Sequence, residues 1–267
     1  MTATALMMKS LRDRWRSVTA WAVAICGLCI LQLSVYPTVV RSGSGISQFI
    51  EQYPDVLKKV FRLQDYTTGP GYLGTEVFSL MVPLVLIAVG AAWGASTTAE
   101  EEERGSADLL LTMPVSRSWV LLWKSVAGMV GIALVAGITY ATIFVGSGMV
   151  DLTVNFRHLF EATAASALLG VLFGGVGLFA GVLLGRRGPA LGIATGLALI
   201  CFVFYSLSPL VDTFDAIAPG NPFEWAIGGI PLSNGVSWEA FTKLGAVSAA
   251  FLLLSGWALQ RKDIHAP

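Results

Sequence analysis

The chain has 267 residues, of which 55% are hydrophobic and 13% are charged, and its formal net charge is zero. Soluble domains carry about 25% charged residues, so this composition excludes an ordinary soluble domain and indicates an integral membrane protein. A balanced charge also provides no bulk field that would attract nucleic acid, and no nucleic-acid partner is expected. The three cysteines lie inside apolar segments without companion ligands, which predicts packing residues and no metal site.

Six apolar segments are long enough to cross a bilayer as helices. A basic amphipathic stretch, residues 1–16, precedes the first of them and is typical of a short helix on the membrane surface. The pattern predicts an all-α membrane protein in which residues 1–267 form a single transmembrane domain. Its spans are expected at about residues 17–40, 77–96, 120–150, 163–184, 189–210 and 241–259.

Lysine and arginine are unevenly distributed between the predicted loops. If the amino terminus is cytoplasmic, eleven of the 17 basic residues fall on the cytoplasmic side and six on the other. Cytoplasmic loops of membrane proteins carry an excess of these residues. Both termini and the loop at residues 97–118 are therefore predicted to face the cytoplasm.

Glycines recur at four-residue spacing in the fourth and fifth spans, which only a short turn separates. Small residues on one helix face let membrane helices approach closely, because lipid supplies no hydrophobic drive for their association. We therefore expect helix packing by Gly170, Gly174, Gly177, Gly181, Gly185, Gly188, Gly192 and Gly196.

No Asp, Glu, Lys, Arg or His falls near the centre of a predicted span. Ion-coupled transporters need such groups in the membrane interior, so an ion-driven mechanism is disfavoured. His158 and His265 both lie outside the spans, which disfavours an intramembrane hydrolase, and no catalytic residue is predicted. Energy for any transport is then expected to come from outside the chain.

A charged insert, residues 97–118, separates the second and third spans. Within it, Ala107, Leu110, Leu111 and Pro114 follow the i, i+3, i+4, i+7 spacing of a helix with one apolar face. An apolar face on a water-exposed loop favours docking by a soluble partner. The alternative is a solvated acidic face whose leucines rest on the bilayer.

The insert also carries the pattern E-E-E-x-G-x-x-D-L-L-L-x-x-P-V-S-R, beginning at Glu101. It resembles the loop between spans two and three of the permease subunits of bacterial ABC-2 type ATP-binding cassette transporters, which have six spans. Weaker similarities precede the second span and close the chain. They comprise Pro70, Gly71, Tyr72, Leu73, Glu76, Phe78 and Ser79, and then Arg261, Lys262, Asp263 and Ile264.

The resemblance implies an amphipathic elbow helix at residues 1–16 and a coupling helix in residues 97–118 that seats in a cytoplasmic ATPase subunit. It also implies a pathway between two permease halves, the second being another copy or a paralogue, in a bacterial plasma (inner) membrane. ATP and Mg²⁺ would be held by the ATPase, with no cofactor in this chain. The implied ATPase contacts are Glu101, Glu102, Glu103, Arg104, Gly105, Asp108, Leu109, Leu110, Leu111, Pro114 and Arg117.

The expected function is that of a permease subunit in an ATP-driven transporter, with no enzymatic activity of its own. Aromatic and aliphatic faces of the spans, including Phe173, Phe202 and Tyr205, suit a hydrophobic or amphipathic substrate, and export is expected. Two alternatives stay open. A non-transporting membrane scaffold or assembly factor could use the same insert, and a secondary transporter would depend on an ion gradient.

Overall fold

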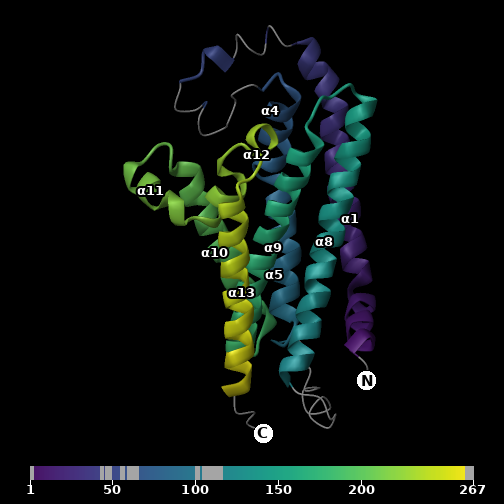
Figure 1. Cartoon of the computed structure of the whole chain (residues 1–267), viewed down its shortest axis with the longest axis vertical. Helices are drawn as coiled ribbons and strands as arrows, with labels where there is room; N and C mark the ends of the chain where they lie inside the picture. Colours follow the sequence, from purple (N-terminus) through teal and green to yellow (C-terminus); the bar gives the residue numbers. More distant parts are fainter. Residues whose placement is uncertain are drawn as a thin grey trace.

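The computed structural model describes residues 3–42, 45, 50–54, 58, 66–99, 103 and 117–261. Every regular element in these ranges is a helix, and the described part of the chain contains no strand. Six helices are long and apolar enough to cross a membrane, which confirms the predicted all-α architecture with six spans. Figure 1 shows the long helices side by side in an elongated bundle.

Six long helices build the bundle, and short helices extend or connect them. The long ones are α1 (Ala3–Arg41), α5 (Met81–Ser96), α8 (Arg117–Met149), α9 (Phe156–Leu184), α10 (Arg187–Leu207) and α13 (Trp238–Arg261). Helix α4 (Gly69–Leu73) and the π-helix η1 (Gly74–Phe78) lead into α5. A lobe between α10 and α13 contains α11 (Asp212–Ile217), the 3₁₀ helix η2 (Ala218–Gly220), the π-helix η3 (Glu224–Gly228) and α12 (Pro231–Asn234).

Helix α1 is longer than the first predicted span. It continues without a break from Ala3 to Arg41, so the predicted elbow at residues 1–16 is continuous with the span within the described residues. No glycine or proline interrupts the sequence between Ala3 and Cys26, and both residue types are the usual causes of a helix break.

The second membrane-crossing segment begins at Gly69, eight residues before the predicted start. Thr68 caps it by accepting a hydrogen bond from the N–H of Gly71 at 3.2 Å, and Pro70 occupies the first turn, where a proline is tolerated. Glu76 consequently lies inside this segment, near the end where it starts. Its carboxylate accepts a hydrogen bond from the hydroxyl of Tyr66 at 2.7 Å. Burial and this carboxylate together raise the pKa of Tyr66, so the hydroxyl stays protonated as a donor.

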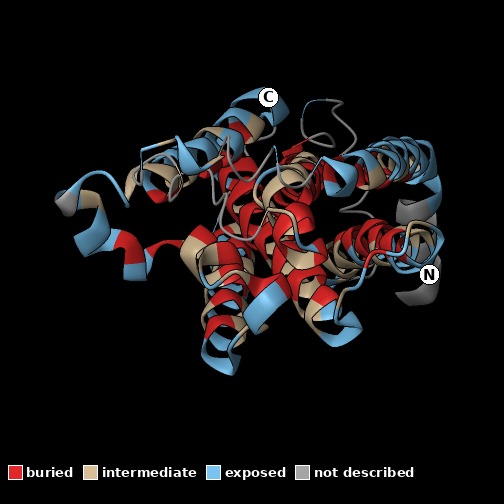
Figure 2. Ribbon diagram, turned by 90° about the horizontal axis from the view of Figure 1, so that it is seen from above, coloured by how far each residue is buried: buried red, intermediate tan, exposed pale blue. Residues whose placement is uncertain are grey.

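Helices α5 and α9 form the centre of the bundle. In an apolar 18-residue window of the segment Gly69–Ser96, which contains α5, 67% of the residues are buried, and in that of α9 61% are, against 22% in α10 and in α13. Helix α9 contacts α5, α8, α10 and α13. Viewed from above, the buried residues gather on the central helices and the exposed ones on the periphery (Figure 2). This distribution leaves the outer helices to face lipid.

Glycines on both central helices explain their close approach. A Cβ added to Gly90 or Gly94 of α5 would overlap the carbonyl oxygen of Gly170 or Gly174 of α9. In the opposite direction, a Cβ on Gly170 would lie 2.6 Å from the carbonyl oxygen of Leu86. Farther along α9, a Cβ on Gly177 or Gly181 would lie 3.1 Å or 3.3 Å from backbone atoms of α5. The partner of the α9 glycines is therefore α5, and the glycines of α5 did not figure in the sequence-based expectation.

The other four predicted glycines, at the end of α9 and in α10, lie in different environments. Gly185 ends α9 in the left-handed conformation, with a φ of 63°, which glycine adopts without strain. At Gly188, Gly192 and Gly196, in contrast, no described atom lies within 4 Å of an added Cβ. The packing expected of these three stays a prediction, and it requires a partner outside the described chain.

Candidate coupling site

The charged insert joins the end of α5 to the start of α8, and α1 begins and α13 ends at this same end of the bundle (Figure 1). We call it the insert end. Of the residues implied to contact an ATPase, Glu103 is described, and Arg117 is described as the first residue of α8. The others, Glu101, Glu102, Arg104, Gly105, Asp108, Leu109, Leu110, Leu111 and Pro114, lie outside the described residues.

Glu103 connects the insert to the start of α10. Its Oε1 accepts a hydrogen bond from the backbone N–H of Arg187 at 2.8 Å. Arg187 is the first residue of α10, and the preceding Arg186 provides no side-chain cap. A carboxylate at a helix amino terminus satisfies a free N–H and interacts favourably with the helix dipole. The contact joins residues 84 positions apart, and no local sequence pattern indicated it.

Two cations hold the carboxyl end of α5, where the insert begins. The ammonium of Lys124 in α8 donates to the carbonyl oxygen of Thr97 at 3.2 Å. The guanidinium of Arg14 in α1 donates to the carbonyl oxygen of Ser96 at 3.4 Å and to the hydroxyl of the same residue. Basic side chains at a helix carboxyl terminus bind its free carbonyls and oppose its dipole. The last turn of α5 is therefore attached to both α1 and α8.

Trp93 occupies the junction of these three helices. Its indole N–H donates to the carbonyl oxygen of Lys124 at 3.2 Å, and the guanidinium of Arg14 lies 5.3 Å from its ring centroid. The ring also packs against Gly131 of α8, where an added Cβ would lie 3.0 Å from ring carbon Cζ3. Trp93 thus contacts both α1 and α8 from the last turns of α5.

A hydrogen bond brings α13 to the same end. The side-chain amide of Gln260 donates to the hydroxyl of Ser118 at 2.8 Å, which connects the last turn of α13 to the first turn of α8. Helices α1, α5, α8, α10 and α13 are all bonded to one another or to Glu103 near the insert. Five of the six long helices are therefore connected at or near the candidate site.

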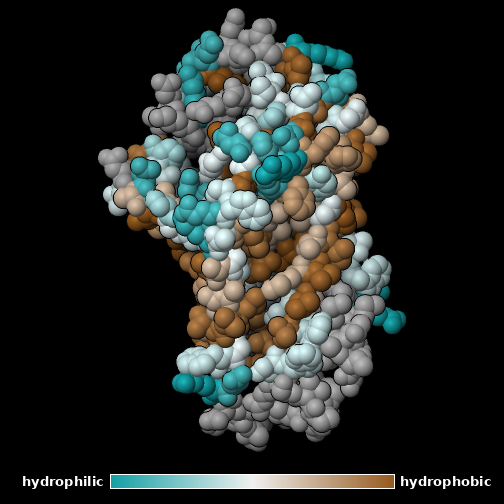
Figure 3. Space-filling model, viewed as in Figure 1, coloured by the Kyte–Doolittle hydropathy of each residue, from teal (hydrophilic) through white to brown (hydrophobic). Residues whose placement is uncertain are grey.

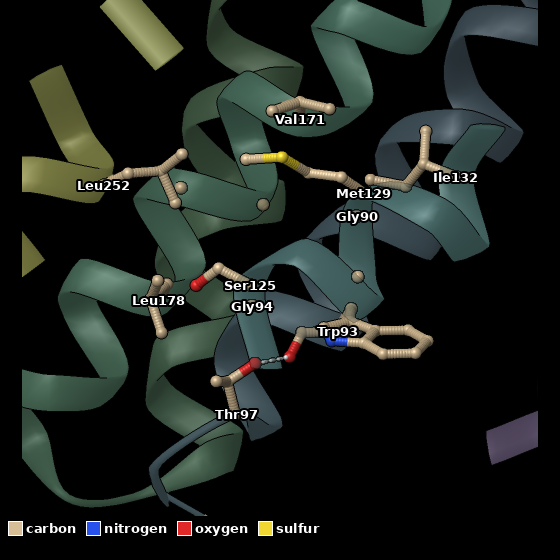
Figure 4. Close-up of a pocket in the computed structure, with 13 residues that line it drawn as sticks. Gly90, Trp93, Gly94, Thr97, Ser125, Met129, Ile132, Val171, Leu178 and Leu252 are labelled. Carbon is tan, nitrogen blue, oxygen red and sulfur yellow. Dashed lines mark hydrogen bonds between the residues drawn. The ribbon is translucent and has the colours of Figure 1, made fainter. Parts of the chain in front are cut away.

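A small cavity lies beside Trp93, between α5, α8, α9 and α13 (Figure 4). Its volume is about 30 Å³, which suits a water molecule and no larger ligand. Thr97 and Ser125 supply hydroxyls, and the glycines of the α5–α9 contact form much of the remaining wall. The cavity is therefore too small for a transported substrate in this conformation.

The described residues at the insert end form no metal centre. Within the described ranges, no group of three or more His, Cys, Asp or Glu side chains converges to hold a metal ion. The polar contacts described there join helix ends to one another.

Six apolar helices with a charged insert at one end define a multi-pass membrane protein. The sequence profile of the family described as ABC-2 family transporter protein matches residues 5–264. The chain belongs to this family and is a membrane-embedded permease of an ATP-binding cassette transporter. A comparison with curated proteins finds no match.

Proposed function

We propose that this chain is the permease subunit of an ATP-driven exporter and that a separate cytoplasmic ATPase docks on the insert at residues 97–118. The observation that carries the proposal is the junction at the insert end, where Glu103, Arg14 and Lys124 connect the insert and the end of α5 to α10, α1 and α8. A loop that a soluble partner displaces needs such connections to transmit the displacement to the membrane spans. ATP and Mg²⁺ belong to the ATPase in this proposal.

The path of the motion follows from the packing. Closure of the ATPase pair would displace the insert, and the connections of Trp93 and Lys124 would carry the displacement into α1 and α8. Helices α5 and α9, whose backbones touch at Gly90 and Gly170, would move as one body. Rocking of this body against α1 and α8 would alternate access to the two sides of the membrane.

A second permease half would complete the pathway. The open face of α10 at Gly188, Gly192 and Gly196 supports this part of the proposal, because small residues at four-residue spacing are typical of contacts between membrane helices. The partner would be a second copy of this chain or a paralogue. A hydrophobic or amphipathic substrate would then pass between the two halves.

We propose that the insert end lies in the cytoplasm of a bacterial cell, with the permease in the plasma membrane. The distribution of lysine and arginine supports this orientation. Figure 3 shows the expected bilayer contact as a hydrophobic band over the middle of the bundle, with hydrophilic side chains above it and at the lower end of α13.

The first test is purification of the tagged chain from its own membrane in mild detergent. We expect an ATPase to co-purify in stoichiometric amount, and Glu102→Lys with Glu103→Lys, or Leu110→Asp, to abolish its association. The matched control is Glu51→Lys, an exposed acidic residue between α1 and α4. A chain that purifies alone would favour a scaffold, and transport that follows an ion gradient without ATP would favour a secondary transporter.

A further inference from the structure

A wide groove lies at the end of the bundle opposite the insert. It is enclosed by the lobe between α10 and α13 and by the first turns of α13, and its volume is about 760 Å³. Small-molecule sites in proteins measure roughly 300–1,000 Å³. The groove is thus large enough for a ligand, whereas the cavity beside Trp93 is not. The proposed function gives this groove no role.

Polar contacts hold the lobe in place, so the groove is formed without a ligand. The side-chain amide of Asn221 donates to the carbonyl oxygen of Cys201 in α10 at 2.7 Å. The carboxylate of Glu161 in α9 accepts from the N–H of Val236 at 3.1 Å, and the ring of His158 contacts the carbonyl oxygen of Leu232 at 3.3 Å. A preformed site binds without the cost of ordering its own walls.

The lining of the groove is acidic. Asp215, Glu224 and Glu239 contribute carboxylates, and Lys243 is the one basic residue among the described residues that line it. The walls therefore carry two more negative than positive groups. The bundle as a whole has no such bias, since the formal net charge of the chain is zero. This local excess favours a positively charged ligand.

An indole forms one wall and already faces a cation. The ammonium of Lys243 lies 5.9 Å from the ring centroid of Trp225 and 2.7 Å from a carboxylate oxygen of Glu239. The indole N–H of Trp225 donates to the carbonyl oxygen of Pro219 at 2.7 Å, which fixes the orientation of the ring. A fixed aromatic face beside carboxylates is the arrangement that proteins use to bind ammonium groups. The position of Lys243 shows that this geometry suits an ammonium group.

We propose that this groove binds an organic cation with an apolar body, whose charge lies over Trp225 and is balanced by Asp215 and Glu224. Ala218, Pro219 and Ala226 provide apolar surface for the body of the ligand. Lys243 competes with the ligand for Trp225 and Glu239. Binding requires neither ATP nor the ATPase.

The test uses the full chain in lipid nanodiscs and equilibrium dialysis against tetraphenylphosphonium, with empty nanodiscs subtracted. Tetraphenylborate has the same shape and the opposite charge, so it separates the groove from simple partition into lipid. We expect saturable binding of the phosphonium alone. Because neither ATP nor an ATPase is present, failure here would leave the proposed transport function untouched.

Variants assign the binding to the groove. Trp225→Ala should weaken binding about tenfold, in line with a desolvated cation–π contact, and Asp215→Asn, an exposed substitution, should weaken it about threefold. Lys243→Met should tighten binding about threefold, because it removes the competing ammonium. Trp238→Ala and Asp151→Asn are controls, since both residues are exposed near the same end and neither lines the groove.

The proposal fails if the phosphonium does not bind above empty nanodiscs or if the borate binds equally well. It also fails if the control variants weaken binding as much as the groove variants do. Size-exclusion profiles of each variant separate a lost site from a lost fold. If Trp225→Ala does not fold, Asp215→Asn and Lys243→Met decide the question, because their expected effects have opposite signs.

Discussion

Two glycine stripes with the same four-residue spacing lie in opposite surroundings. On α9, Gly170 and Gly174 meet glycines of α5 so closely that a methyl group would overlap backbone atoms. On α10, no described atom lies within 4 Å of a Cβ added at Gly192. The spacing thus predicts a helix face that another helix can approach, and it does not say whether that helix belongs to the same chain. The α9 stripe packs on α5 of the same chain, whereas the α10 stripe points outward.

The largest effect is expected at Gly94, where α5 and α9 are in backbone contact. Gly94→Leu would place a side chain against the carbonyl oxygen of Gly174, and a backbone atom inside a packed helix pair cannot move aside. We expect a loss of at least about 3 kcal/mol in the free energy of unfolding or no folded chain at all. Thermal unfolding in detergent, followed by size-exclusion chromatography, measures it. A stable, monodisperse variant would show that α5 and α9 pack less closely than described.

Gly192→Leu is the matched substitution on the open stripe. A Cβ at this position has open space around it within 4 Å, so the thermal unfolding midpoint should stay within about 2 °C of that of the wild type. If α10 contacts a second permease half, the variant should be monomeric where the wild type is dimeric. Native mass spectrometry resolves the two states. A variant that remains dimeric would assign the α10 stripe to lipid.

The next effect concerns the end of α5, the helix that carries the packed stripe. Arg14→Met removes the bonds to Ser96 and the cation over Trp93, and we expect the free energy of unfolding to fall by about 1–2 kcal/mol. Arg12→Met is the control, because Arg12 is exposed on the same helix two residues away. Equal unfolding midpoints for the two variants would show that the contacts of Arg14 with Ser96 and Trp93 do not stabilise the fold.

The smallest effect concerns the start of α10, the helix that carries the open stripe. Glu103→Gln keeps an acceptor for the N–H of Arg187 and removes the charge that opposes the helix dipole. The expected loss is about 0.3–1 kcal/mol at low ionic strength, and it should diminish as salt is added. Unfolding midpoints at two salt concentrations measure this. A loss that does not depend on salt would mean that the charge of Glu103 has no role in the contact.

Sequence reasoning succeeded where the signal is local and failed where two distant segments meet. The apolar lengths predicted six spans and an all-α fold, because each span satisfies its own backbone and needs no partner to be recognised. The start at Gly69 was missed because Glu76 and the surrounding glycines look like a loop, although Tyr66 supplies a hydroxyl to the carboxylate. The bond from Glu103 to Arg187 and the groove around Trp225 depend on segments that only the folded chain brings together.

The predicted docking residues illustrate the same limit at the candidate site. The pattern from Glu101 to Arg117 identified the family, which the profile match over residues 5–264 supports independently. It gave no information on how the insert is anchored, because Arg14, Trp93 and Lys124 belong to three different helices. Their contacts with one another follow from the packing of α1 and α8 against α5.

The most direct test of the account measures ATP hydrolysis by the co-purified ATPase in vesicles that contain the permease. We predict that the wild-type chain stimulates vanadate-sensitive hydrolysis and that Glu102→Lys with Glu103→Lys removes the stimulation, while the permease remains inserted and monodisperse. Stimulation that survives the double charge reversal would contradict the claim that the insert is where the ATPase docks.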